Sequence, residues 1–254
     1  MRLLASVMSA AEAEVAVAAG VDIIDAKNAR QGALGALDKD ELVSIRRVVP
    51  AHIPLSATTG DLPCDDIEGV RAAVARVAAS GVDFVKIGFF TNAGSRADGH
   101  AEMARLLAAL THDVHAFGRR VGVLLADRNP DIEIVPALRA AGFAGVMLDT
   151  ADKTGAALPE IAPHAMLLDF IDYAHDAGLF AGLAGALRLR HIPEMTALGP
   201  DILGFRGALC EDCERQAVIW PPSVTVLRDA LAAAPFAQRQ GIIAVADGCK
   251  DAPR

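Results

Sequence analysis

Short apolar runs alternate along the whole chain with longer segments whose apolar residues recur at helical spacing. The short runs are rich in aliphatic and β-branched residues, and they predict eight strands, at 3–7, 22–25, 54–58, 83–88, 121–126, 145–149, 179–184 and 201–205. The segments between them predict amphipathic helices, among them those at 66–80, 101–118 and 164–178. The repeating unit is therefore strand, loop and helix.

Glycines mark the points at which several of these helices give way to the next strand. Gly20, Gly81, Gly142 and Gly178 are each followed by an apolar residue that opens a predicted strand. Glycine is the usual residue just beyond a helix C-terminus, because the chain there adopts a left-handed conformation. We expect each of these glycines to end its helix.

A strand that alternates with helices must pair in parallel with its neighbours, because each helical crossover returns the chain to the same end of the sheet. Eight such units in 254 residues predict a single (β/α)8 TIM barrel, an α/β fold that takes about 250 residues. The rival is an open, doubly wound sheet with a glycine-rich loop after the first strand, and 3-LLASVMSAAEAE-14 has no such loop. We expect one barrel domain at 1–234 and a C-terminal tail at 235–254.

The charge pattern limits the partners of such a protein. The net charge is −8 and the arginines are scattered, which argues against nucleic acid or an anionic membrane surface as a partner. The first residues lack the pattern of a signal peptide, and no apolar run reaches the ~18 residues of a membrane span. We expect a cytoplasmic protein with a small-molecule substrate, and a homo-oligomer is compatible with the sequence.

Cysteines provide no clear metal site. Cys64, Cys210, Cys213 and Cys249 are expected to be free thiols. Cys210 and Cys213 form a lone Cys-x-x-Cys pair, without a second pair or a histidine at zinc spacing. We expect no metal and no organic cofactor.

Lysine is the rare cation of this chain, since 19 of its 24 basic residues are arginines. A guanidinium stays charged, whereas a desolvated ammonium can lose its proton, so lysine is needed where the chemistry requires a neutral amine. Three of the five lysines, Lys27, Lys86 and Lys153, fall at or after the C-terminal ends of the second, fourth and sixth predicted strands. This end of a TIM barrel carries the active site.

The surroundings of the three lysines differ. Asp25 and Lys27 are two residues apart, so both point to the same side if the strand continues between them. Lys86 has apolar neighbours, and desolvation there favours a neutral amine. Lys153 follows Asp149 in a polar loop that we expect nearer solvent and able to swing over the site.

Each lysine also has a simpler interpretation. Lys27 would then form a salt bridge with Asp25, Lys86 a buried ion pair with a barrel carboxylate, and Lys153 would be a loop charge.

Two glycine-bearing turns predict a phosphate site. They follow the seventh and eighth strands, in 182-GLAGAL-187 and 204-GFRGAL-209. Loops at these positions often bind phosphate in barrels through backbone N–H groups and a helix N-terminus. We therefore expect Gly185 and Gly207 to bind a substrate phosphate, with Arg206 adding charged donors; simple tight turns are the alternative.

Lysines beside a phosphate site indicate a phosphorylated carbonyl substrate. A neutral lysine can condense with the carbonyl to give a Schiff base, and a nearby base can then remove the α-proton. Asp25, Lys86 and Asp149 are the candidate proton carriers.

Several segments resemble the (5-formylfuran-3-yl)methyl phosphate synthases of methanofuran biosynthesis. They are 4-LASV-7, 22-DIIDAKNARQGALGAL-37, 83-DFVKIG-88, 148-LDTADKTG-155, 182-GLAGAL-187 and 204-GFRGALC-210. The resemblance implies a lyase that joins two molecules of glyceraldehyde 3-phosphate into a phosphorylated furan aldehyde, with loss of phosphate and water. It also implies that Lys27 forms the imine and that Lys86 accepts the proton.

Two other functions fit the same residues. Asp25 and Lys27 resemble the Asp/Lys dyads of phosphate-binding decarboxylases and isomerases, which make no imine. A phosphosugar sensor on a barrel scaffold is the non-catalytic alternative, although recognition alone does not require lysine.

Overall fold

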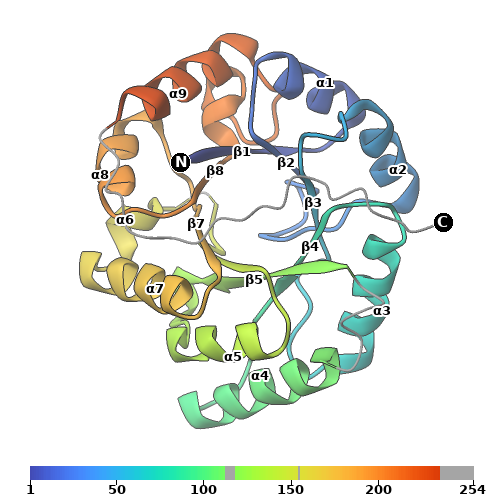
Figure 1. Cartoon of the computed structure of the whole chain (residues 1–254), viewed down its shortest axis with the longest axis vertical. Coiled ribbons are helices and arrows are strands. Elements are labelled where there is room, and N and C mark those ends of the chain that lie inside the picture. Colours follow the sequence, from blue (N-terminus) through green and yellow to red (C-terminus); the bar gives the residue numbers. More distant parts are fainter. Residues whose placement is uncertain (112–117, 154, 235–254) are drawn as a thin grey trace, which may run out of the picture.

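The computed structural model describes residues 1–111, 118–153 and 155–234, and in them eight parallel strands close into a barrel. Each strand pairs with its two neighbours in chain order, and β8 pairs with β1. Helices surround the strands (Figure 1). The strands are β1 (Arg2–Val7), β2 (Ile23–Ala26), β3 (Leu55–Thr58), β4 (Phe84–Gly88), β5 (Arg119–Leu125), β6 (Gly145–Asp149), β7 (Phe180–Leu183) and β8 (Ile202–Phe205).

The helices occupy the predicted intervals between the strands. The α-helices are α1 (Ala10–Ala18), α2 (Lys39–Val48), α3 (Ile67–Ala78), α4 (Arg96–Thr111), α5 (Val135–Ala140), α6 (Leu158–Ile161), α7 (His164–Asp176), α8 (Ile192–Ala197) and α9 (Pro221–Ala233). Short 3-10 turns are η1 (Ala126–Arg128), η2 (Ile132–Ile134), η3 (Leu189–His191), η4 (Gly207–Leu209) and η5 (Glu211–Cys213). The predicted TIM barrel is confirmed.

The local predictions also hold in most details. All eight strands lie where the apolar runs placed them, and Gly20, Gly81, Gly142 and Gly178 have φ between 72° and 83°, as expected beyond a helix end. The helix predicted at 101–118 begins earlier, at Arg96, because the hydroxyl of Ser95 accepts a hydrogen bond from the N–H of Asp98. The end of that predicted helix, 112–117, lies outside the described residues.

Strand residues alternate between two apolar layers. Outward-facing residues such as Ile24, Leu55 and Val85 pack with the helices in the main core. Inward-facing residues such as Ile23 and Phe84 form a separate cluster within the barrel, which also contains Leu4, Val121, Val123, Met147 and Ile202. Because side chains alternate along a strand, Asp25, two positions after Ile23, also faces the interior.

Aspartates fix the N-terminal ends of several strands. The carboxylates of Asp22, Asp83 and Asp201 accept hydrogen bonds from the backbone N–H groups of Leu3, Leu55 and Ala181, respectively. Each bond joins the start of one strand to its neighbour and satisfies an N–H that would otherwise be unpaired. These contacts stabilise the end of the barrel opposite the lysines, so the two ends have different roles.

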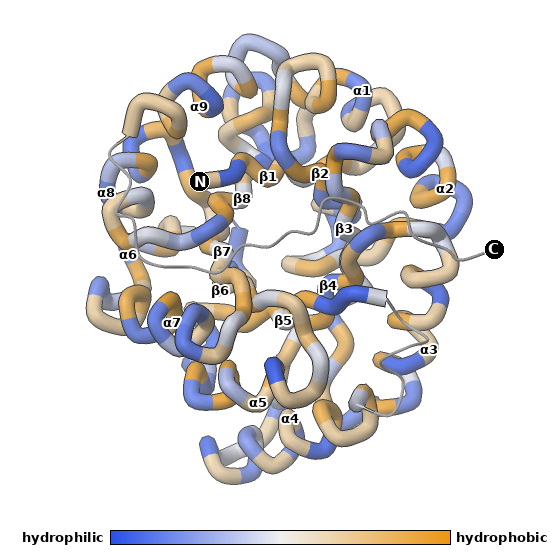
Figure 2. The backbone as a smooth tube through the Cα atoms, in the orientation of Figure 1, coloured by the Kyte–Doolittle hydropathy of each residue, from blue (hydrophilic) through white to orange (hydrophobic). Residues whose placement is uncertain are grey.

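The barrel elements run from Arg2 to Ala233, and the predicted tail at 235–254 lies outside the described residues. Hydrophilic and hydrophobic residues alternate along the surrounding helices (Figure 2). Within the described ranges, no helix is both long enough and apolar enough to cross a membrane.

Candidate active site

The predicted catalytic residues meet at the C-terminal end of the barrel. Asp25 lies on β2, and Lys27 is the first residue after that strand. Lys86 lies on β4, and Asp149 is the last residue of β6. These side chains and that of Lys153 line one cavity, together with residues of the loops after β7 and β8. The structure thus brings together all five residues that the sequence indicated.

Asp25 is fully buried, and its carboxylate has several hydrogen-bond and ion-pair partners. Its Oδ2 accepts a hydrogen bond from the Ser6 hydroxyl at 3.1 Å, and its Oδ1 accepts one from Ser56 at 2.6 Å. The Lys86 ammonium lies 3.1 Å from the same Oδ1. Burial by itself would raise the pKa of Asp25, but the charges of Lys86 and Lys27 and the Ser56 hydrogen bond hold that pKa below its usual value. The carboxylate is therefore ionised.

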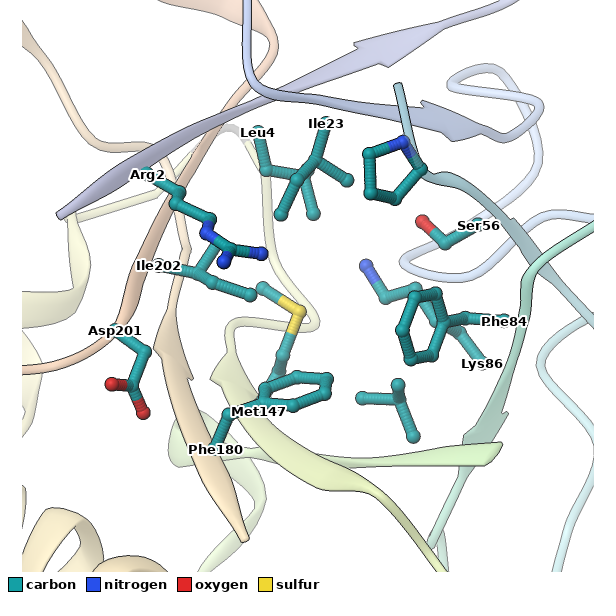
Figure 3. A pocket seen from close by; sticks show the side chains of 12 residues that line it. Arg2, Leu4, Ile23, Ser56, Phe84, Lys86, Met147, Phe180, Asp201 and Ile202 are labelled. Atoms are coloured by element: carbon teal, nitrogen blue, oxygen red, sulfur yellow. The ribbon is translucent and has the colours of Figure 1, made fainter. Parts of the chain in front are cut away.

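Lys86 lies between the catalytic cavity and an apolar cavity near the N-terminal end of the barrel. It lines both, and in Figure 3 its side chain points inward near Ser56, with Phe84, Met147 and Phe180 around the same cavity. The side chain of Lys86 is only 4% exposed. The ion pair with Asp25 is the simpler arrangement considered above for Lys86.

Lys27 has a looser ion pair than Lys86. Its Nζ lies 3.9 Å from Oδ2 of Asp149, and its side chain is 7% exposed. Burial lowers the pKa of Lys27 to about 8, with Asp149 opposing the shift and the charge of Lys153 adding to it. The neutral fraction of this amine near neutral pH is therefore larger than that of an ordinary lysine. The simple Lys27–Asp25 salt bridge considered above is not formed, because Asp25 pairs with Lys86 instead.

Lys153 folds back onto Asp149 and is 10% exposed, so it is more buried than its polar loop suggested. Burial lowers the pKa of Lys153, while Asp149 opposes that shift. The loop is held by Asp127, whose two carboxylate oxygens accept hydrogen bonds from the N–H groups of Ala151 and Asp152 at 2.7 and 2.8 Å. Asp127 thus places Lys153 over the site.

Asp149 connects the two lysines. Its Oδ1 accepts hydrogen bonds from Lys153 Nζ and from the backbone N–H of Thr150, and its Oδ2 faces Lys27. Burial alone would raise the pKa of Asp149, but Lys153 and Lys27 lower it well below its usual range. In both amines beside it, this anion opposes the lowering of the pKa by burial.

Arg206 has a different environment from the one expected of a phosphate ligand. Its Nη1 and Nη2 donate to both carboxylate oxygens of Glu12, and the remaining N–H groups donate to the carbonyls of Ser6, Arg215 and Ala217. An arginine has five N–H donors, and all five are used within the protein. The geometry favours a positioning role, in which Arg206 holds the loop after β8, over direct phosphate contact.

The two predicted glycines line the same cavity as the lysines. Gly185 has φ 115°, and a Cβ there would lie 2.6 Å from Cγ2 of Thr150. A Cβ at Gly207 would lie 2.8 Å from Nη1 of Arg188. Gly185 therefore requires glycine, whereas a side chain at position 207 would displace the flexible end of Arg188. Their predicted contact with phosphate stays a prediction.

Four further residues of the site were not assigned a role from the sequence. Ser6 and Ser56 bind Asp25, and Ser56 is detectable as a polar residue within an apolar strand. Arg188 and Arg215 line the cavity from the loops after β7 and β8. Nothing in their spacing separates them from the other arginines. Among the described cysteines, Cys64, Cys210 and Cys213 are free thiols, as predicted, and Cys249 lies outside the described residues.

Comparison with known proteins identifies the family. A family model described as 4-HFC-P synthase matches residues 3–228. The chain belongs to the 4-HFC-P synthase family. Relatives named (5-formylfuran-3-yl)methyl phosphate synthase include those of Methanocaldococcus jannaschii, 38% identical over 85% of this chain and 92% of the relative, and Methanopyrus kandleri, 38% identical over 91% and 99%. The resemblance found in the sequence motifs is confirmed, and the chain is a member of an enzyme family.

Solved structures share the fold of this 4-HFC-P synthase family member. Phosphoribosyl anthranilate isomerase from Thermus thermophilus aligns with a TM-score of 0.60 at 14% identity, covering 91% of this chain and 98% of the isomerase. A 3-hexulose-6-phosphate synthase aligns with a TM-score of 0.55 at 17% identity, covering 91% and 100%. At these identities the likeness concerns the barrel fold alone.

Proposed function

We propose that this protein is a (5-formylfuran-3-yl)methyl phosphate synthase that acts through a Schiff base on Lys27. Two molecules of glyceraldehyde 3-phosphate combine, and one phosphate and two molecules of water are released, to give a phosphorylated furan aldehyde for methanofuran-type cofactors. The reaction places the enzyme among the carbon–oxygen lyases that act on phosphates. Family membership and the relatives' names support the product, and the site geometry supports the chemistry.

The observation that carries this proposal is the environment of Lys27. Its amine is buried, its pKa is lowered to about 8, and its nearest carboxylate oxygen lies 3.9 Å away. A neutral amine is the form that attacks a carbonyl, and desolvation provides that form near neutral pH. Lys86 and Lys153 each form a closer ion pair with a carboxylate, which leaves Lys27 as the most available nucleophile.

The Asp25–Lys86 pair supplies the proton transfers. Attack of Lys27 on the aldehyde gives a carbinolamine, whose hydroxyl must take up a proton to leave as water. Lys86, charged through its pair with Asp25, donates that proton and becomes a neutral amine. The protonated imine withdraws electrons from the adjacent carbon, so the neutral Lys86 can accept the α-proton. An enamine on Lys27 results, which can attack the second aldehyde or expel phosphate.

Asp149 and Lys153 are the second pair of residues beside the Lys27 amine. Asp149 faces Lys27 and stabilises the positive charge of the iminium ion. Lys153, hydrogen bonded to Asp149, is placed to protonate an oxygen that leaves from the substrate. These two residues therefore serve the later eliminations, while Asp25 and Lys86 serve enamine formation.

The test is the balance of products formed from glyceraldehyde 3-phosphate. The purified protein is expected to release one phosphate for every two aldehydes consumed, and to form a furan aldehyde phosphate that mass spectrometry and ultraviolet absorbance detect. Asp25→Asn should remove most of this turnover. Consumption without furan formation, or decarboxylation of a keto-sugar phosphate in its place, would favour the Asp/Lys dyad chemistry. Binding of phosphosugars without turnover would favour the sensor.

A further inference from the structure

Two arginines at the edge of the catalytic cavity have no assigned role. Arg188 follows β7 and Arg215 follows β8, and both are partly buried. Together with Lys153, they line the catalytic cavity and the adjoining outer groove. Any ligand that enters from the groove toward Lys27 therefore passes beside both guanidinium groups.

Neither arginine has a carboxylate partner in the part of the chain that the structure describes. Nη1 of Arg188 donates to the carbonyl of Cys213 at 3.3 Å, and Nη2 of Arg215 donates to the carbonyl of Gly32 at 3.2 Å. These are the side-chain hydrogen bonds of the two residues, and most of their N–H donors remain for a ligand. Burial and the nearby charge of Arg206 lower the pKa of Arg215, while Asp149 opposes the shift. A bound anion would offset both the burial of this charge and its repulsion by Arg206.

The neighbouring arginines are already paired. Arg190, on the same loop as Arg188, donates to Glu160 at 2.9 Å, and its side chain is 66% exposed. Arg206 is fully used by Glu12 and backbone carbonyls. Arg188 and Arg215 differ from both, because each is a cation near the lysines that has no carboxylate counter-ion among the described residues.

Other contacts place these two side chains. The missing side chain at Gly207 leaves room for the guanidinium of Arg188, which lies only 2.8 Å from where a Cβ would be. Nε of Arg206 donates to the carbonyl of Arg215 at 2.9 Å, so the buried Glu12–Arg206 pair fixes the backbone that carries Arg215. Gly207 and Arg206, both expected to bind phosphate, thus act on the arginines that face the ligand.

We propose that Arg188 and Arg215 bind the phosphomonoester group of the substrate whose carbonyl reacts with Lys27. This inference rests on the proposed function and names the side chains that recognise its substrate. Two guanidinium forks match the oxygens of a phosphate and form charge-assisted hydrogen bonds. Because Arg215 also contacts the carbonyl of Gly32, in the loop that follows Lys27, phosphate binding is linked to the loop beside the nucleophile.

The experiment compares Arg188→Ala and Arg215→Ala with Arg190→Ala, the matched control on a paired arginine. Calorimetry with inorganic phosphate, and the KM for glyceraldehyde 3-phosphate, are measured for each. Loss of a charge-assisted bond should weaken phosphate binding and raise KM roughly ten- to a hundredfold in the first two variants. Arg190→Ala should match the wild type. Arg215→Lys, which keeps the charge and loses the fork, should fall between wild type and Arg215→Ala and guards against a folding defect.

A third measurement separates this inference from the proposed function. Borohydride trapping with unphosphorylated glyceraldehyde should label Arg215→Ala as well as wild type, since that aldehyde has no phosphate to lose contact with. Wild-type phosphate affinity in both alanine variants would overturn the arginine assignment, even if the imine forms. Weakened phosphate binding in a protein that never forms an imine would instead uphold the arginine site and contradict the Schiff-base function.

Discussion

Nζ of Lys86 lies 3.1 Å from Oδ1 of Asp25, so the carboxylate two residues before Lys27 pairs with a lysine from a different strand. Lys27 is left with Asp149, whose oxygen is 3.9 Å away. The surroundings thereby separate the two amines: Lys86 forms a close ion pair with a buried carboxylate, whereas Lys27 has a looser pair and a pKa that burial lowers to about 8.

The pH dependence of imine formation tests this separation. The pKa of Lys27 is about 8, and the reactive form is the neutral amine. Imine formation at limiting aldehyde should therefore rise with pH and level off above about 8, well below the value of 10.5 for an ordinary lysine. The measurement is the rate of borohydride-trapped adduct as a function of pH.

Two variants should move that midpoint in opposite directions. Asp149 opposes the effect of burial on the pKa of Lys27, so Asp149→Asn should shift the midpoint to lower pH. The charge of Lys153 adds to the effect of burial, so Lys153→Met should shift the midpoint to higher pH. Shifts in the same direction, or no shift, would show that Asp149 and Lys153 do not control the pKa of Lys27.

Lys86→Arg should separate imine formation from the later steps. The variant keeps a cation beside Asp25, but a guanidinium cannot become the neutral base that accepts the α-proton. A trapped adduct on Lys27 should still accumulate, although more slowly, because a guanidinium is a poor replacement for Lys86 as the proton donor for the loss of water. Furan formation should fall by at least about a hundredfold, the size of a general acid–base contribution. Mass spectrometry of the intact protein reports the adduct. Full furan formation in this variant would exclude Lys86 as the base.

Lys86→Met should lower the free energy of unfolding by about 3–5 kcal/mol, because it leaves the buried Asp25 carboxylate without its cation. The double variant Lys86→Met with Asp25→Asn should recover much of this loss, since an amide keeps hydrogen bonds with Ser6 and Ser56 without a charge. Urea denaturation at neutral pH measures both. Equal stability of the single and double variants would show that the pair is not coupled.

The pH dependence of that loss has a defined sign. Without Lys86, the folded-state pKa of Asp25 should rise, because burial raises this pKa and the charge that most opposes burial is lost. The penalty for ionised Asp25 is then absent at low pH and grows as pH rises through the folded pKa. The difference in stability between wild type and Lys86→Met should therefore be smaller near pH 4 than near pH 7.

Arg206→Ala should act first on stability. It leaves Glu12 buried without its partner and frees the carbonyls of Arg215 and Ala217. The free energy of unfolding should therefore be about 3–5 kcal/mol lower than in wild type. The second variant, Glu12→Gln, should also destabilise the protein, although Glu12 lies outside the catalytic cavity. A direct phosphate ligand would give the opposite pattern: normal stability with weakened phosphate binding in Arg206→Ala alone. Thermal unfolding and calorimetry distinguish the two.

Much of the fold followed from local sequence. Short apolar runs and the glycines that follow helices predict the order of strands and helices, and parallel pairing then brings Asp25, Lys27, Lys86 and Asp149 to one end of the barrel. The ion-pair partners of these residues could not be predicted from local sequence, because an ion pair depends on strand register and on how deep each side chain lies. From the sequence, Asp25 could pair with Lys27, two residues later, or with Lys86 on β4, and only the packing shows that it pairs with Lys86.

The phosphate side of the site shows the same limit. Arg206 stood out between two glycines, but its partner Glu12 lies 194 residues away in the sequence. Arg188 and Arg215 carry no local signal, and their importance comes from what they lack among the described residues, a carboxylate within ion-pair distance. Whether the N–H donors of an arginine have partners depends on the folded chain, and a local sequence motif does not show it.

Reductive trapping tests directly whether Lys27 forms the Schiff base. The wild-type protein is incubated with glyceraldehyde 3-phosphate and borohydride, digested, and mapped by mass spectrometry, with Lys27→Arg as the control that keeps the charge and removes the nucleophile. We predict a stable adduct on the peptide that contains Lys27, no adduct at this position in Lys27→Arg, and no furan formation by that variant. Wild-type turnover without any trapped adduct, or an adduct on Lys86 or Lys153 alone, would contradict a Schiff base on Lys27.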